Sequence, residues 1–117
     1  MNHVEKYITY PMAITIFKQD IEKFQKIKLG NLYQDMLESI IERMQEDFYK
    51  LQDELRSRYR IDVQRLENGK YKVNDEVLEY TSEELKEFTS QLMSEYLYGD
   101  KAREFERKDR AWKPSTD

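Results

Sequence analysis

The sequence lacks several residue types that common active sites require. It has no cysteine, which excludes disulfide frameworks, thiolate nucleophiles and iron–sulfur clusters. Its one histidine, His3, stands at the N-terminus, so neither a serine–histidine–aspartate triad nor a two-histidine metal site is expected. The three glycines are isolated, which excludes a glycine-rich phosphate loop. We therefore expect a protein that is not an enzyme and that holds no cofactor and no metal.

Long apolar runs are also missing. No stretch approaches the roughly 18 apolar residues of a membrane-spanning helix, and the first ten residues lack the apolar segment of a secretory signal. These absences favour the cytoplasm and argue against a membrane partner. Charged residues make up 38% of the 117 positions and aromatic residues 13%, which is typical of a folded domain with amphipathic helices.

A stripe of apolar residues predicts a first helix. Pro11 suits the first helical turn, where its missing N–H costs nothing, so we place the start of a short helix of about four turns there. The alternative is a strand, because residues 7–17 are dense in β-branched and aromatic side chains, but the proline disfavours it. The apolar positions at helical spacing are Ile14, Phe17, Ile21 and Phe24.

A second and longer helix follows. Gly30 is suited to end the first helix and Asn31 to cap the next. Apolar residues then recur at helical spacing from Tyr33 to Tyr59, which predicts a helix of about 28 residues. Because a short first helix cannot cover so long a stripe, we expect the third helix or a second copy of the chain to cover the rest. The second case predicts a homodimer with its interface at Met44, Phe48, Leu51, Leu55 and Tyr59.

The period of the apolar pattern changes to two after the long helix. Asn68 and Gly69 form the strongest short hairpin signal, because both residues tolerate the positive φ of a tight turn. A second turn at Asn74 and Asp75 leads into another apolar run. We therefore predict a two- or three-stranded antiparallel β-meander at 61–80, which must pack on the helices to be stable.

Thr81 and Glu84 have the spacing of a capping box, so a third helix is predicted to begin there and to end near Gly99. From Asp100 onward we expect a short charged helix or tail that docks through Phe105 and Trp112. The whole prediction is a mainly helical α+β fold in one domain, residues 1–112, followed by a disordered tail, 113–117.

The net charge of −4 is concentrated in residues 61–99, which carry nine acidic and four basic side chains. A cluster of arginines begins just before this region and extends into it. It is interpreted either as an anion or nucleic-acid contact, because arginine forks match phosphate oxygens, or as cations that complement the helix dipole. The absence of a basic surplus disfavours nucleic acid. The cluster consists of Arg56, Arg58, Arg60 and Arg65.

Three further patterns stand in the sequence. Glu38, Glu42 and Glu46 share one helical face, but without histidine in the body of the chain they indicate a solvated face rather than a di-iron site. Most of the nine tyrosines are expected at the rim of the core with their hydroxyls in water. The methionines in helical stripes, among them Met44 and Met93, are interpreted as core, with an adaptable binding groove as the alternative.

The run Tyr-Leu-Tyr-Gly-Asp at 96–100 resembles the Tyr-x-x-x-Asp tail signal of small type VII secretion substrates. The Trp-x-Gly turn of that family is absent, since Trp112 is the only tryptophan, and the β-meander does not belong in a two-helix export substrate. The resemblance covers five residues and implies an exported helical hairpin.

The sequence thus predicts a small, cytoplasmic, non-enzymatic protein that acts by protein–protein interaction or regulation. We expect a protein partner and a homodimer. The bias toward lysine, glutamate, isoleucine and tyrosine is typical of low-GC Gram-positive bacteria and their phages or mobile elements. The alternative function is a nucleic-acid-associated regulator that uses the arginine cluster.

Overall fold

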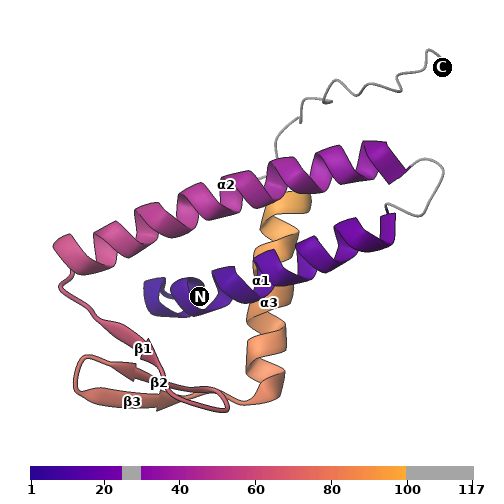
Figure 1. Cartoon of the computed structure of the whole chain (residues 1–117). Helices are drawn as coiled ribbons and strands as arrows, with labels where there is room; N and C mark the ends of the chain where they lie inside the picture. The colour runs from indigo at the N-terminus through magenta and orange to yellow at the C-terminus, as the bar shows by residue number, and fades with distance from the viewer. Residues whose placement is uncertain (25–29, 100–117) are drawn as a thin grey trace, which may run out of the picture.

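The computed structural model describes residues 1–24 and 30–99, so the predicted docking of Phe105 and Trp112 and the predicted tail lie outside the described residues. The structure has two long helices, a shorter third helix and one small sheet. Figure 1 shows that the third helix crosses the long helices steeply and that the sheet lies beyond one end of them. The predicted mainly helical α+β fold is confirmed. The elements are α1 (His3–Phe24), α2 (Gly30–Ser57), β1 (Val63–Arg65), β2 (Lys70–Val73), β3 (Glu76–Glu79) and α3 (Ser82–Leu97).

The predicted start of the first helix at Pro11 is wrong, because α1 begins eight residues earlier, at His3. A capping box starts it: the Glu5 N–H donates to Asn2 Oδ1 at 2.8 Å, and the Asn2 N–H donates to Glu5 Oε1 at 3.0 Å. A proline inside a helix costs about 3 kcal/mol, since it removes one hydrogen bond and crowds the preceding turn. Burial of Ile8 and Tyr10 in the turn before Pro11 offsets this cost.

The helix α2 begins at Gly30 and spans 28 residues, which is the predicted length. Its apolar stripe is covered within one chain: α1 packs along it, and α3 contributes Leu92 and Tyr96 to the same core. Of the two expected ways to cover the stripe, the third helix is therefore the one observed. The core consists of Tyr10, Ala13, Ile14, Phe17, Leu37, Ile40, Ile41, Met44, Leu51, Leu55, Leu92 and Tyr96.

The three-stranded form of the predicted meander is the one observed, with antiparallel neighbours in the order β1-β2-β3. Asn68 and Gly69 adopt left-handed backbone angles, with φ of 42° and 81°, in the first turn, and Asn74 does so in the second, with φ of 53°. Buried Tyr71 on β2 contacts the ring of Tyr80 at 6.3 Å between centroids. The sheet is thus joined to the start of α3.

The third helix begins as predicted. Thr81 accepts a hydrogen bond from the Glu84 N–H at 3.1 Å, and Glu84 Oε1 accepts one from the Thr81 N–H at 2.9 Å. At the other end, the Gly99 N–H donates to carbonyls of the last helical turn. The Thr81 capping box thus sets where α3 begins after the sheet.

Candidate binding groove

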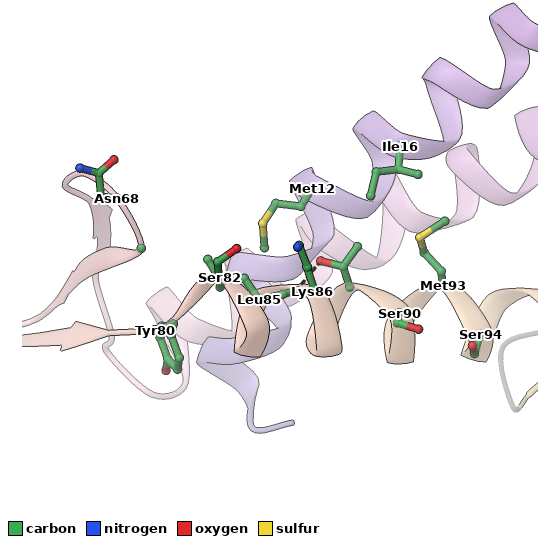
Figure 2. Close-up of a pocket in the computed structure, with 12 residues that line it drawn as sticks. Met12, Ile16, Asn68, Tyr80, Ser82, Leu85, Lys86, Ser90, Met93 and Ser94 are labelled. Carbon is green, nitrogen blue, oxygen red and sulfur yellow. Dashed lines mark hydrogen bonds between the residues drawn. The ribbon is translucent and has the colours of Figure 1, made fainter.

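An apolar groove of about 760 Å³ opens between α1, α3 and the turn that joins β1 to β2. In Figure 2 the side chains of Met12 and Ile16 extend from α1, and Met93 extends from α3 toward them. We call this feature the α1–α3 groove. Its lining residues are Met12, Ile16, Asn68, Gly69, Tyr80, Ser82, Leu85, Lys86, Thr89, Ser90, Met93 and Ser94.

Helical spacing places the apolar walls of the groove. Met12 and Ile16 stand one turn apart on α1, while Leu85, Thr89 and Met93 follow one another at four-residue steps on α3. The Thr89 hydroxyl donates to the Leu85 carbonyl at 2.7 Å, so it is satisfied within its own helix. The floor of the groove is therefore apolar.

Gly69 closes one end of the groove. Its carbonyl accepts a hydrogen bond from the Tyr80 N–H at 2.9 Å, which joins the hairpin turn to the chain that enters α3. A Cβ atom at this position would overlap the Tyr80 carbonyl. The close approach of these two backbones therefore needs glycine for its missing side chain as well as for its left-handed φ.

A smaller hollow of about 270 Å³ adjoins the groove beneath the sheet and shares Met12, Gly69 and Leu85 with it. Its walls bring the inner face of the sheet opposite the beginning of α1 and the middle of α2. The apolar floor thus continues from the α1–α3 groove toward the sheet. The remaining lining residues of the hollow are Tyr7, Ile8, Pro11, Phe48, Val63, Arg65 and Tyr71.

The one charged side chain that lines the α1–α3 groove is Lys86, whose ammonium lies 3.9 Å from a carboxylate oxygen of Glu83. The two side chains are 75% and 87% exposed, so water screens the pair and its energy is small. The lysine is therefore free to move when the groove is occupied.

The groove does not present an activated nucleophile. A serine–lysine dyad needs a desolvated lysine, whereas Lys86 is exposed and paired with Glu83. Ser82, Ser90 and Ser94 stand at the solvent edge of α3, as Figure 2 shows. Among the residues that the structure describes, no group of three histidine, aspartate or glutamate side chains is placed to hold a metal ion.

A buried chain of hydrogen bonds lies between the three helices. The Tyr10 and Tyr96 hydroxyls are 2.9 Å apart, and Tyr96 donates to Asp47 Oδ2. Burial raises the pKa of Tyr96, and its hydrogen bonds to Asp47 and Tyr10 raise it further. Burial also raises the pKa of Tyr10. Tyr10 and Tyr96 are thus exceptions to the expectation that most tyrosines lie at the rim of the core with their hydroxyls in water, because the half-buried Asp47 accepts a hydrogen bond from Tyr96.

The burial of Tyr96 bears on the resemblance to type VII secretion substrates. Tyr96, the tyrosine of that motif, is 2% exposed and belongs to the core. Asp100 lies outside the described residues. The side chain that would be read as a tail signal is therefore a packing residue here.

The interface predicted on the long helix lies largely inside the molecule. Met44, Leu51 and Leu55 are buried, and half-buried Phe48 stacks on Tyr7 with 5.1 Å between ring centroids. Tyr59 is 41% exposed and stacks on His3 at 5.2 Å. The homodimer stays a prediction, and these residues no longer support it.

The arginine cluster is exposed along its whole length. Arg56, Arg58 and Arg60 stand at and just after the C-terminal end of α2, where they complement the helix dipole, and the Arg58 guanidinium lies 5.6 Å from the Tyr59 ring centre. Arg65 lies on β1, opposite Tyr71 of β2. The nucleic-acid alternative remains a prediction.

The sequence patterns did not single out Met12 or Ile16, and they placed Met93 in the core or, as the alternative, in an adaptable binding groove. The available signal was that the first helix carries apolar residues on a second face, away from the stripe of Ile14 and Phe17. Whether that face is covered depends on how α3 crosses α1. Local sequence patterns do not determine the crossing angle between α1 and α3.

None of the helices within residues 1–24 and 30–99 has the length and apolar content to span a membrane.

Comparison with known proteins places the whole described structure in one family. A family model described as YhjD protein matches residues 1–101, which include the three helices, the sheet and the groove. Searches of curated proteins and of solved structures find no match. The chain belongs to the YhjD protein family.

Proposed function

We propose that this chain is a small, non-enzymatic interaction protein of the cytoplasm, and that it binds a segment of a partner polypeptide in the α1–α3 groove. The observation that carries the proposal is an apolar floor open to solvent along its length, between Met12 and Ile16 on one side and Leu85 and Met93 on the other. A concave, mainly apolar surface is the usual form of a binding site in proteins.

The shape of the groove favours a polypeptide over a small molecule. Small-molecule sites enclose most of their ligand, whereas this groove is open and follows α3 from Ser82 to Ser94, a rise of about 18 Å at 1.5 Å per residue. That length matches about three turns of a docked helix, which would place anchors at i, i+4 and i+7.

The side chains of the groove also suit a partner helix. Met12 and Met93 have flexible, polarizable thioethers that adapt to the shape of an incoming apolar face. Ile16 is 36% exposed although it is large and aliphatic, and covering it would remove apolar surface from water. Ser90 and Ser94 at the rim offer hydroxyls to the polar side of the partner.

Fluorescence anisotropy with a labelled peptide tests the proposal. The probe is an amphipathic peptide of about 14 residues with leucine and phenylalanine on one face and glutamine and serine on the other. We expect saturable binding to the full chain and a loss of about tenfold or more in Ile16→Glu, because a carboxylate would enter the apolar floor.

The matched control is Val77→Glu, which adds the same charge at an exposed position on β3, away from the groove. It should bind the peptide as the wild type does. Equal binding by the wild type and by Ile16→Glu would contradict the proposed site, and no binding by either would contradict the proposed function.

A further inference from the structure

The solvent edge of the groove on α3 is acidic. Glu83, Glu87, Ser90 and Ser94 follow one another at steps of four, three and four residues and therefore form one stripe along the helix. Ser90 and Ser94 line the groove, and Glu83 and Glu87 are both exposed. The rim that Ser90 and Ser94 form is therefore continued by the carboxylates of Glu83 and Glu87 toward the N-terminal end of α3.

The opposite edge of the groove does not balance this charge. On α1, beyond Ile16, Asp20 and Lys23 lie 3.8 Å apart and neutralise each other. The whole segment 61–99 carries nine acidic and four basic side chains. A ligand that spans the groove therefore meets an apolar floor and a net negative rim.

Lys86 is the one positively charged side chain that lines the groove, so its position has to be reconciled with a negative rim. In Figure 2 its ammonium group projects over the groove between the two helices. Its ammonium lies 3.9 Å from a carboxylate oxygen of Glu83, so it can be held at the rim. An occupant would displace the Lys86 side chain, and its positive charge would weaken the attraction of the rim for cations.

We propose that the occupant of the α1–α3 groove is an amphipathic helix of a partner protein, with apolar residues on one face and lysine or arginine on its flanks. This inference rests on the proposed function and adds the charge of the partner. The basic flank lies against Glu83 and Glu87, and the apolar face covers Met12, Ile16 and Met93. Charge complementarity of this kind selects partners and raises association rates more than it adds affinity.

Three peptides of about 14 residues test the charge of the partner, with the same leucine and phenylalanine face and with lysine, glutamine or glutamate on the flanks. At about 50 mM salt we expect the lysine peptide to bind the full chain about tenfold more tightly than the glutamate peptide, with the glutamine peptide between them. At about 0.5 M salt the three affinities should converge, because exposed charges are then screened.

Substitutions at the rim should change the affinity for the lysine peptide in opposite directions. Glu87→Lys should weaken binding of the lysine peptide about three- to tenfold, whereas Lys86→Gln should tighten it by a similar factor. The control is Glu76→Lys on β3, which makes the same charge change as Glu87→Lys at an exposed position outside the groove. Because Glu76→Lys changes only the net charge of the protein and not the rim, it should change the affinity by less than about twofold.

The outcomes separate the two proposals. If all three peptides bind with equal affinity, or if the glutamate peptide binds best, the groove is an interaction site but the basic partner is wrong. If Glu76→Lys weakens binding as much as Glu87→Lys, the preference comes from net charge and the role of the rim is refuted. If no peptide binds, the proposed function itself fails.

Discussion

The hydroxyls of Tyr10 on α1 and Tyr96 on α3 lie 2.9 Å apart, although 86 positions separate them in the sequence. Because Tyr96 gives its proton to Asp47 on α2, Tyr10 is the donor to Tyr96, and one chain of hydrogen bonds joins all three helices. The guanidinium of Arg43, one turn before Asp47, stands over the Tyr96 ring at 5.8 Å. This buried cluster fixes where α3 crosses α1, and that crossing forms one wall of the groove.

Tyr96→Phe should destabilise the protein by about 1–3 kcal/mol, because the Tyr10 hydroxyl and the Asp47 carboxylate left behind each lose a hydrogen-bond partner. Urea unfolding followed by circular dichroism measures the change. Tyr98→Phe, two residues later at a position that is 84% exposed, is the control and should stay within about 0.5 kcal/mol of the wild type. Equal effects of the two substitutions would mean that the buried chain adds no stability.

The stability of the fold should fall at alkaline pH. The pKa values of Tyr10 and Tyr96 are raised in the folded state, so the folded state holds protons that the unfolded state loses above about pH 10. The stabilising contribution is therefore complete below pH 10 and is lost as the pH rises above it. Unfolding free energies measured between pH 8 and 11 should decrease more steeply for the wild type than for the double variant Tyr10→Phe, Tyr96→Phe. Parallel curves would contradict the assignment.

Gly69→Ala should destabilise the protein by about 1–3 kcal/mol and loosen the end of the groove, because its Cβ would overlap the Tyr80 carbonyl at a left-handed φ. Asn68→Gly, at the neighbouring left-handed position, should be nearly neutral, because glycine tolerates that backbone conformation. Thermal unfolding of the two variants checks the contrast. A tolerated Gly69→Ala would show that the turn does not pack against the Tyr80 backbone.

Leu55→Asp should abolish cooperative unfolding, because it places a charge in the hydrophobic core. Tyr49→Asp, on the same helix at a position that is 62% exposed, should fold normally. The unfolding midpoint of the wild type at several protein concentrations completes this test. A midpoint that does not depend on concentration would agree with a stripe covered within one chain, whereas a midpoint that rises with concentration would indicate the homodimer.

Elements with local signals were predictable from the sequence. Thr81 and Glu84 form the expected capping box, and Asn68 with Gly69 forms the expected turn, because the physics of each lies within four residues. The start of α1 was missed although Asn2 and Glu5 have the same capping spacing. Burial of the turn that precedes Pro11 overrides the preference of proline for the first helical turn.

The candidate site was less predictable because it depends on tertiary geometry. Tyr10, Asp47 and Tyr96 come together only when three helices pack, and no spacing in the sequence connects them. Met12 and Met93 line a groove because α3 crosses α1 beside the hairpin turn. A sequence pattern identifies apolar faces, but the packing angle decides which face remains uncovered.

The most direct test of the account is a methyl NMR titration of the full chain, labelled at its methionine methyl groups, with the lysine-flanked peptide. Met12 and Met93 line the groove, whereas Met44 is fully buried in the core between the helices. The account predicts that the Met12 and Met93 signals shift together with a single affinity while the Met44 signal stays in place. Binding that leaves Met12 and Met93 unchanged would contradict the groove as the interaction site.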